Sequence, residues 1–281
     1  MHYVIGDVHG CYHEMLSLIN KIEERDSSPV IYFLGDFIDR GKYVWDVFEW
    51  MRENITPNGR YRSLRGNHEE YVIEWYKEWC CWYRNPMYSM PETSYDFSKW
   101  LDAADYLYPK KLETIIEFFN SLSLEETLDI ETINGRKIRY RLAHAWSSFG
   151  NKFSNYSEYA DAVLLSRNLD GNIFNDDIVV FGHTPTPAYK SCRPGLIDYM
   201  HNAINLDGGA VFQNANRFYP CMLCAVCLET LEEIYCDSIE NRIRMANSSQ
   251  SDETIENIIQ KYRDKYLKDE PIYRVELLKR I

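Results

Sequence analysis

The chain has 281 residues, of which 45% are hydrophobic and 26% are charged, and its formal net charge is −12. These values are ordinary for a soluble globular protein, and a chain of this length buries a large core without disulfides. So negative a charge argues against a duplex nucleic-acid binder, which carries a basic face. It also repels phosphate compounds at long range, so a phosphate site in this protein must carry its own positive charge.

The N-terminal segment and the cysteines predict where the protein works. Residues 1–7 (MHYVIGD) lack the basic and apolar regions of a secretory signal, and no stretch approaches the ~18 apolar residues of a membrane-spanning helix. The eight cysteines of such a chain are expected to be reduced thiols. We therefore predict a cytoplasmic protein that does not bind a membrane.

Three units of strand, loop and helix begin the chain. Apolar runs at 3–5, 30–34 and 61–64 predict buried strands, and a polar loop containing glycine follows each of them. Apolar residues at helical spacing over 15–22 and 44–51 predict amphipathic helices after the first two loops. Strand, loop and helix recurring in this order indicate a layered α/β fold.

The next stretch, about 71–125, is predicted to be an inserted helical cap. Pro86 and Pro91 interrupt it, and aromatic residues crowd its first half. The aromatic residues are Trp75, Tyr76, Trp79, Trp82, Tyr83, Tyr88, Tyr95, Phe97, Trp100, Tyr106 and Tyr108. Most of these rings are expected to pack the helices of the cap, and contact of one or two of them with substrate is the alternative.

Strand-like runs return in the second half of the chain. They lie at 137–142, 178–181, 204–206 and 221–228. From residue 251 the apolar residues recur at helical spacing, which predicts a C-terminal helix on the outside of the same domain. No internal repeat or low-complexity linker divides the sequence, so we expect a single domain over 1–281.

Potential metal ligands follow five of the predicted strands. They are Asp7 and His9, Asp36 and Asp39, Asn67 and His68, His144, and His183. Ligands gather at the carboxyl ends of strands in open α/β sheets, so the five clusters are expected to meet at one rim. A single histidine after a strand is usually an ordinary hydrogen-bonded residue, and the prediction therefore depends on convergence. Gly6, Gly35, Gly66 and Gly182 precede four of the clusters and allow close approach of the backbone.

The ligand types favour catalytic metal ions. Carboxylate, amide and imidazole groups without thiolates suit Mn²⁺, Fe or Zn²⁺ better than a structural zinc site. Two divalent ions with Asp7, Asp36 and a bridging hydroxide carry a net charge of about +1. Arg40 and Arg167 can add to it and grip a phosphate with paired hydrogen bonds. The metals would thus supply the local positive charge that the acidic protein lacks.

Five segments resemble the signature blocks of the phosphoprotein phosphatase family of calcineurin-like metallophosphoesterases, in its bacterial Ser/Thr protein phosphatase form. They are 6–10 (GDVHG), 35–41 (GDFIDRG), 66–69 (GNHE), 144–145 (HA) and 182–183 (GH). Residues 204–210 (INLDGGA) are similar to the closing strand of bacterial members, whereas Trp146 stands where many members have glycine. The resemblance implies a central β-sandwich flanked by helices.

The resemblance also implies a site for two divalent metal ions. Mn²⁺ is the expected metal, with Fe or Zn²⁺ as alternatives. The ligands of the first ion would be Asp7, His9 and Asp36. Asp36 would bridge to the second ion, whose remaining ligands would be Asn67, His144 and His183.

The same resemblance implies catalytic and substrate-binding residues. His68, oriented by Asp39, would protonate the leaving group, and pairing with a carboxylate keeps more of an imidazole protonated. Arg40 matches the phosphate-binding arginine of the family, and Arg167 in 164–167 (LLSR) is similar to a second phosphate clamp. A hydroxide held by both metals would attack phosphorus in line with the leaving group, without a phosphoenzyme.

Three functions compete for this site. A metal-dependent phosphomonoesterase acting on phosphorylated proteins, a Ser/Thr protein phosphatase, is favoured because residues 39–41 (DRG) are intact. Small phosphate esters are possible further substrates. A dinucleoside tetraphosphate hydrolase of the same superfamily is the alternative, since those enzymes tend to lack that aspartate. A non-catalytic scaffold is remote, because no expected ligand is missing. The sequence leaves the oligomeric state open, and buried packing is the expected role of Cys221, Cys224 and Cys227.

Overall fold

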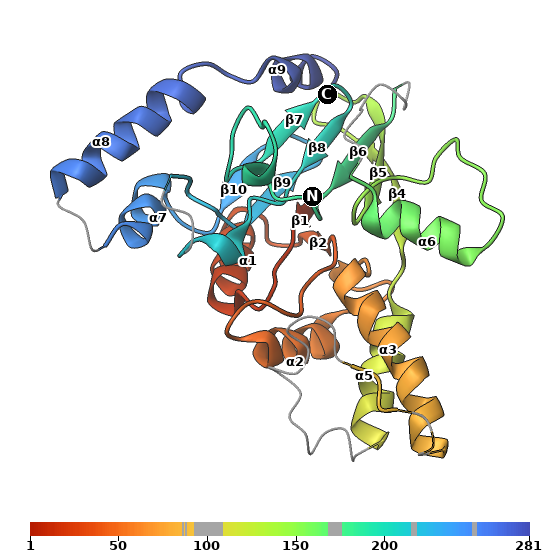
Figure 1. Ribbon diagram of the computed structural model, residues 1–281. Coiled ribbons are helices and arrows are strands. Elements are labelled where there is room, and N and C mark those ends of the chain that lie inside the picture. Colours follow the sequence, from red (N-terminus) through yellow and green to blue (C-terminus); the bar gives the residue numbers. More distant parts are fainter. Residues whose placement is uncertain (86, 88, 93–108, 168–175, 215–217, 249–251) are drawn as a thin grey trace.

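The computed structural model describes residues 1–85, 87, 89–92, 109–167, 176–214, 218–248 and 252–281 (Figure 1). Its centre consists of two five-stranded mixed sheets, with helices around them. The predicted α/β fold, a central pair of sheets flanked by helices, is confirmed.

The first sheet has the strand order β10-β9-β1-β2-β3. Its strands are β1 (His2–Ile5), β2 (Val30–Phe33), β3 (Tyr61–Ser63), β9 (Cys224–Cys227) and β10 (Glu233–Tyr235). β1, β2 and β3 are parallel, and the helices α1 (Tyr12–Arg25) and α2 (Val44–Asn54) make the crossovers that parallel neighbours require. β9 and β10 extend the sheet in antiparallel fashion. β10 has no counterpart among the predicted strands.

The second sheet has the order β4-β5-β6-β8-β7. Its strands are β4 (Glu125–Glu131), β5 (Lys137–Ala143), β6 (Ile178–Phe181), β7 (Asp198–Met200) and β8 (Ala203–Asn205). β5, β6 and β8 are parallel, and β4 and β7 are antiparallel edge strands. The two edge strands are missing from the sequence prediction.

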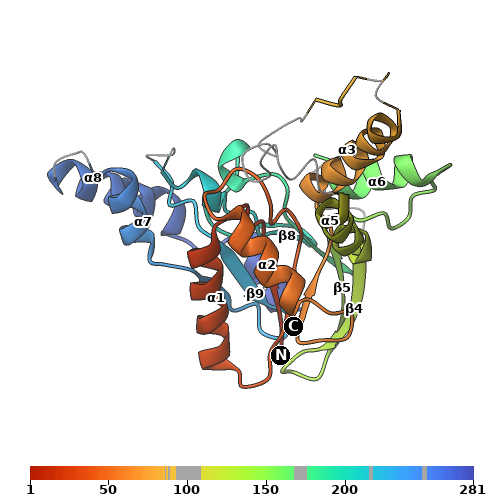
Figure 2. The same ribbon diagram turned by 90° about the horizontal axis from the view of Figure 1, so that it is seen from below.

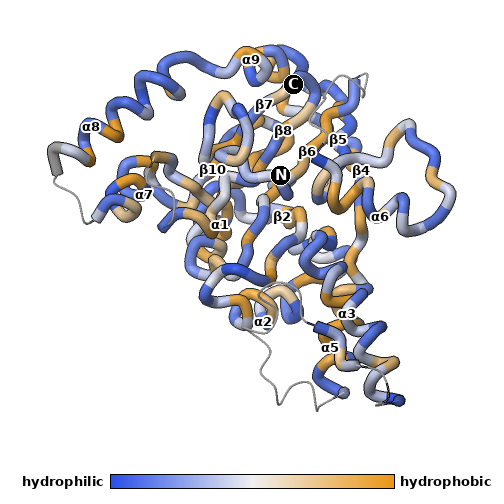
Figure 3. The backbone as a smooth tube through the Cα atoms, viewed as in Figure 1, coloured by the Kyte–Doolittle hydropathy of each residue, from blue (hydrophilic) through white to orange (hydrophobic). Residues whose placement is uncertain are grey.

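The core lies between the two sheets. Val4 of β1 packs in the same hydrophobic cluster as Tyr140 of β5 and Val180 of β6. The Tyr140 hydroxyl donates a hydrogen bond to the carbonyl of Leu228, at 2.7 Å, and so ties the second sheet to the first. Figure 3 shows the hydrophobic stretches gathered in the centre of the molecule. β6 is buried at every position, which is why it is a continuous apolar run in the sequence.

The helices surround this core. α3 (Asn67–Arg84) and α5 (Pro109–Ser121) lie side by side at one end of the molecule (Figures 1 and 2). α7 (Ile239–Ala246) and α8 (Asp252–Tyr262) lie at the other end. The remaining helices of the described residues are α6 (Tyr156–Leu165), α9 (Ile272–Leu278), short turns at Thr186–Ala188 and Ala210–Phe212, and a π-helical turn at Arg263–Leu267.

The region predicted as a cap contains most of α3 and all of α5. α3 begins at Asn67, four residues before the predicted boundary, because the Glu69 carboxylate accepts the N–H of Gly66 at 2.8 Å and caps the helix. Trp75 and Trp79 are buried, as expected for rings that pack helices. Tyr88, Tyr95, Phe97, Trp100, Tyr106 and Tyr108 lie outside the described residues. A cap over the active site stays a prediction.

The C-terminal part packs on the same core as the sheets. α8 begins at Asp252, close to the predicted position, and Ile255, Ile259 and Tyr262 of this helix are buried in the main hydrophobic cluster. Over the part of the chain that the structure describes, no helix combines the length and the apolar character needed to cross a bilayer.

Candidate metal centre and active site

Three strands of the first sheet and two of the second end at a common rim. Asp7 follows β1, Asp36 follows β2, Asn67 follows β3, His144 follows β5 and His183 follows β6. The backbone N–H of His183 donates to Asp7 Oδ2 at 3.0 Å, although the two residues are 176 positions apart. The short loops after the strands thus bring side chains from both sheets into contact.

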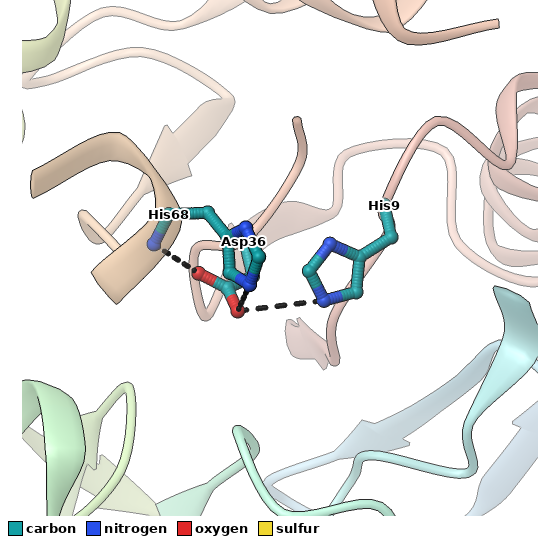
Figure 4. A group of neighbouring side chains, drawn as sticks. All are labelled: His9, Asp36 and His68. Carbon is teal, nitrogen blue, oxygen red and sulfur yellow. Dashed lines mark hydrogen bonds and ion pairs between the residues drawn. The ribbon is translucent and has the colours of Figure 1, made fainter. Parts of the chain in front are cut away.

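Asp36 belongs to two groups of side chains. In each group the candidate ligand atoms all lie within 4.8 Å of one another. The first group is His9, Asp36 and His68, and Figure 4 shows both rings beside the Asp36 carboxylate. The second is Asp36, His144 and His183. Asp36 Oδ2 lies 3.4 Å from Nε2 of His9 and 3.4 Å from Nε2 of His144, so one buried carboxylate can bridge two cations.

Asn67 lies between two histidines of the second group. Its Oδ1 is 2.9 Å from His144 Nε2 and 2.8 Å from His183 Nδ1. The other ring nitrogen of His183, Nε2, is buried and has no hydrogen-bond partner within the described residues. A buried polar atom without a partner calls for an explanation, and a bound cation supplies one.

Backbone carbonyls accept hydrogen bonds from the rings of two histidines, His9 and His144. His9 Nδ1 is 2.8 Å from the carbonyl of Ile38, and His144 Nδ1 is 3.0 Å from the carbonyl of Leu34. A carbonyl only accepts, so each Nδ1 carries the proton and each Nε2 faces Asp36. This hydrogen bond orients a histidine for metal binding through Nε2.

The pKa shifts of the histidines differ with their surroundings. Burial lowers the pKa of His9 well below its ordinary value, so this ring is neutral. Burial and the charge of His144 lower the pKa of His183 to about 3. Burial alone would lower the pKa of His144, but the charge of Asp36 raises it to about 9. A metal ion bound by His144 therefore displaces a proton.

These residues fit a pair of divalent metal ions. Every candidate ligand offers oxygen or nitrogen, all are buried, and His183 Nε2 needs a partner. Burial, followed by the charge of Asp207, raises the pKa of Asp7 well above its ordinary value. A cation bound nearby would lower this pKa, because it stabilises the ionised carboxylate. Two such ions, when bound, polarise phosphoryl oxygens and make a nucleophile available at neutral pH.

Asp207 is a buried acid at the rim that the sequence prediction did not single out. It follows β8, accepts the N–H of Gly209 at 2.9 Å, and its pKa is raised to about 6 by burial. The signal was present in the sequence, because Asp207 directly follows the strand predicted at 204–206 and precedes Gly208 and Gly209, much as Asp7 and Asp36 follow glycines.

Glu69 is a second buried acid without a predicted role, and it ties two loops together. Its Oε1 accepts the N–H groups of Phe37 at 3.1 Å and Ile38 at 3.3 Å. Its Oε2 accepts those of Asp36 at 2.9 Å and Gly66 at 2.8 Å. The loop after β2 is thereby fixed against the first turn of α3, which sets Asp36 beside the residues of that turn.

Backbone strain is concentrated at the same rim. Among the described residues eight non-glycine residues have a positive φ, and five of them belong to the predicted site. The five are His9, Asp36, Asp39, Arg40 and His183. Residues with side chains rarely adopt this conformation, which costs about 1–3 kcal/mol each. The fold tolerates this cost at the site, where the positive φ angles set the direction of the candidate site side chains.

Two glycines let the backbone approach the carboxylates. A Cβ on Gly66 would lie 2.2 Å from Asp36 Oδ1, and a Cβ on Gly182 would lie 2.1 Å from Asp7 Oδ1. Both distances are far below van der Waals contact. The glycines before the ligands therefore serve close approach to aspartate side chains.

His68 and Asp39 form a hydrogen-bonded pair next to Arg40. His68 Nδ1 donates to Asp39 Oδ2 at 2.7 Å. Burial alone would lower the pKa of His68, but the charge of Asp36 and the bond to Asp39 raise it above its ordinary value. Arg40 is exposed, and its guanidinium nitrogens lie 2.6 Å from Nε2 of His9 and 2.9 Å from Nε2 of His68. The positive charge of Arg40 therefore lies between the buried rings of His9 and His68 and the solvent.

Arg167 lies on the His183 side of the site. It is exposed, and its Nη1 donates to the hydroxyl of Thr184, the next residue after His183, at 3.1 Å. Its charge contributes to the lowered pKa of His183. Arg40 and Arg167 thus add positive charge beside different histidines of the site.

Solved structures share this fold. One protein, described as a diadenosine tetraphosphatase, aligns over 83% of this chain and 91% of its own, with a TM-score of 0.51 and 18% identity. The cold-active protein-tyrosine phosphatase of a Shewanella species aligns over 84% of this chain and 78% of its own, also with a TM-score of 0.51 and 18% identity. At such identities the likeness concerns the fold alone.

Relatives in sequence carry a consistent set of names. The asymmetrical bis(5'-nucleosyl)-tetraphosphatase PrpE of Halalkalibacterium halodurans is 26% identical over 249 residues, covering 75% of this chain and 86% of its own. The protein of the same name from Bacillus velezensis is 28% identical over 236 residues, covering 75% and 85%. The symmetrical bis(5'-nucleosyl)-tetraphosphatase of Escherichia coli is 32% identical, but over only 71 residues. These names support the alternative, a tetraphosphatase, better than the favoured Ser/Thr protein phosphatase.

The family itself follows from the extent of the match. The sequence pattern of the calcineurin-like phosphoesterases matches residues 3–199, which is more than half of the chain and includes every candidate ligand. The pair of sheets and the buried histidine and aspartate groups at their rim agree with it. The chain belongs to the calcineurin-like phosphoesterase family and is a metallophosphoesterase, a hydrolase of phosphoric ester bonds.

Proposed function

We propose that the protein hydrolyses dinucleoside tetraphosphates asymmetrically, to a nucleoside monophosphate and a nucleoside triphosphate. The observation that carries the hydrolysis is the pair of buried ligand groups sharing Asp36, with Arg40 and Arg167 beside them. The substrate class is supported by the two relatives named asymmetrical tetraphosphatases, of which the alignments cover 86% and 85%.

Each site residue has a proposed role in metal binding. The first ion would be held by Asp7, His9 and Asp36. The second would be held by Asp36, Asn67, His144 and His183. We propose Mn²⁺ for both positions, because nitrogen and oxygen donors without thiolates suit it.

The remaining residues would act on the substrate. Arg40 would bind phosphate oxygens, since it is exposed and yet contacts His9 and His68. Arg167 would bind a neighbouring phosphate of the chain. His68, held by Asp39, would give its Nε2 proton to the departing oxygen. A tetraphosphate carries several negative charges, so two arginines suit it better than one.

A Ser/Thr protein phosphatase is the second candidate. The observation in its favour is the 2.7 Å pair of His68 and Asp39. An alkoxide leaving from phosphoserine is a strong base and needs a proton, whereas a departing polyphosphate is a weak base. A proton donor such as the His68–Asp39 pair therefore accelerates the hydrolysis of phosphoserine more than that of a polyphosphate.

Product analysis with the Mn²⁺-loaded protein separates the two functions. Diadenosine tetraphosphate and phosphoserine peptides are supplied at equal concentration, with and without chelator, and the products are separated by chromatography. We expect AMP and ATP in equal amounts, formed faster than phosphate is released from the peptides, and no reaction with chelator. ADP as the sole nucleotide product would show symmetrical cleavage. Phosphate from the peptides without nucleotide cleavage would overturn the proposal.

A further inference from the structure

A cavity of about 180 Å³ lies next to the candidate metal ligand Asn67. One wall is the first half of α3, and the other is α6, which lies beside α3 in Figure 2. A cavity of ~150 Å³ holds a benzene ring, whereas drug-sized ligands need about 300 Å³ or more. The cavity therefore has room for one planar ring system and not for a whole nucleotide.

Glu70 is a buried acid in the wall of this cavity. It is 6% exposed, and its Oε2 forms an ion pair with Arg65 Nη1 at 3.2 Å. The Tyr156 hydroxyl donates to Glu70 Oε1 at 3.4 Å and itself accepts from Arg65 Nη2 at 3.0 Å. Arg65 and Tyr156 thus hold this carboxylate in the wall, and the exposed carboxylates of Glu74 and Asp161 are the acceptors that a ligand can reach.

The chemistry of the walls selects the kind of ligand. Glu70, Glu74 and Asp161 line the cavity with carboxylates, and Lys77 is the one basic residue among its described lining. Carboxylates accept hydrogen bonds and repel phosphate oxygens, so the group that enters must donate through N–H and carry no negative charge. Tyr156, Leu164 and other apolar atoms offer the flat surface that an aromatic ring prefers.

We propose that this cavity binds one base of the substrate, and that the base carries an exocyclic amino group, as adenine and guanine do. The inference rests on the proposed function, because it places the base beside phosphates held at Asn67 and the metal centre. The amino group donates to Glu74, and the ring packs against the side chains of α6. The phosphates stay outside, at the arginines. An arginine of a phosphopeptide is the other donor-rich group of suitable size.

Two variants and a matched control test the cavity. Ala160→Leu fills it from α6, where Ala160 is buried at 7% exposure and leucine is a good helix former. Glu74→Gln changes an exposed acceptor on α3 and leaves the core untouched, so this variant folds even if the first does not. Glu78→Gln is the control, because Glu78 is exposed on the same helix and lies outside the lining.

The measurement is calorimetric binding of AMP and of inorganic phosphate to each Mn²⁺-loaded protein. Both ligands carry a phosphate, so the ratio of their dissociation constants reports on the adenosine part of AMP, and the comparison with IMP reports on the amino group of the base. In the wild type and Glu78→Gln, AMP is expected to bind about tenfold or more tightly than phosphate, the value of one hydrogen bond to a charged group. In Ala160→Leu and Glu74→Gln the ratio falls several-fold. IMP, which has a carbonyl in place of the amino group, should bind the wild type more weakly than AMP. Equal ratios in all four proteins would overturn the inference.

Failure of this inference is distinguishable from failure of the proposed function. Cleavage of diadenosine tetraphosphate together with unchanged ratios would remove the base site and leave the function. Absence of cleavage together with a variant-sensitive AMP ratio would remove the function and support the base site. Binding of an arginine-containing phosphopeptide that depends on Ala160 and Glu74, while AMP binding does not, would assign the cavity to a peptide and overturn the inference.

Discussion

Replacement of the Glu69 carboxyl group by an amide tests how the metal loops are held. Glu69 is fully buried and accepts four backbone N–H groups with its two oxygens. In Glu69→Gln the side chain keeps its shape, but an NH₂ group replaces one of the two oxygens. Two of the four backbone N–H groups then face a donor and lose their acceptor. A buried donor left unpaired costs about 1–3 kcal/mol, and bonds to a charged group contribute about 1.5–3 kcal/mol.

The expected loss is therefore about 2–4 kcal/mol in the free energy of unfolding. Chains of comparable length lose about 2–4 °C in Tm per kcal/mol, so we expect Tm to fall by about 5–15 °C. Because two of the N–H groups belong to Asp36 and Phe37, Mn²⁺ affinity should fall as well, by about 10–100-fold. Thermal unfolding followed by circular dichroism and calorimetric Mn²⁺ titration measure the two effects.

Glu78→Gln is the matched control, because it makes the same substitution at an exposed position of α3. It should change neither Tm nor Mn²⁺ affinity. If Glu69→Gln melts and binds Mn²⁺ as this control does, the four hydrogen bonds do not hold the metal loops.

Other changes have equally specific outcomes. His68→Asn should lower kcat for alkyl phosphates by about 10²–10⁴ and much less for para-nitrophenyl phosphate, which leaves without a proton; equal losses would show that His68 is not the acid. Arg40→Ala should weaken product inhibition by phosphate about 10-fold or more, and Arg167→Ala less; unchanged inhibition in Arg40→Ala would contradict its role. Burial alone would raise the pKa of Glu233, but the charge of Arg193 and its hydrogen bond lower it below the ordinary 4.5. The ionised Glu233 therefore stabilises the fold above pH 4.5, and this contribution is lost as the pH falls through the lowered pKa. Glu233→Gln should cost about 3–5 kcal/mol at pH 7 and less in acid, and an equal cost at both, in urea unfolding, would refute the pairing.

The buried parts of the fold are readable in the sequence. β6 lies at the predicted residues, and the predicted faces of α1 and α2 are buried, because elements covered by other elements carry continuous or helix-spaced apolar residues. β4 shows the opposite case. Its residues are mostly half-buried or exposed at the edge of a sheet, so no apolar run marks it, and β7 and β10 are only three residues long.

The convergence of the candidate metal ligands was predictable from the sequence. Aspartates, histidines and an asparagine after successive strands indicate convergence at a rim. The role of Glu69 could not be predicted in this way, because its side chain accepts backbone N–H groups, which leave no pattern of side chains in the sequence. The substrate class could not be predicted in this way either. An intact Asp39 next to Arg40 gives information about the reaction at phosphorus and none about the group attached to the phosphate. For this reason the sequence motif favoured a protein phosphatase, whereas the relatives favour a tetraphosphatase.

The metal content of wild type and Asp36→Asn tests the shared carboxylate most directly. Asp36 Oδ2 lies at the same 3.4 Å from His9 and His144, so the neutral asparagine should weaken both positions. We expect two Mn²⁺ per wild-type chain by elemental analysis after dialysis, none in Asp36→Asn, and two in the control Asp39→Asn. One ion retained by Asp36→Asn at wild-type affinity, or a wild type that binds a single ion, would contradict a centre built on a bridging aspartate.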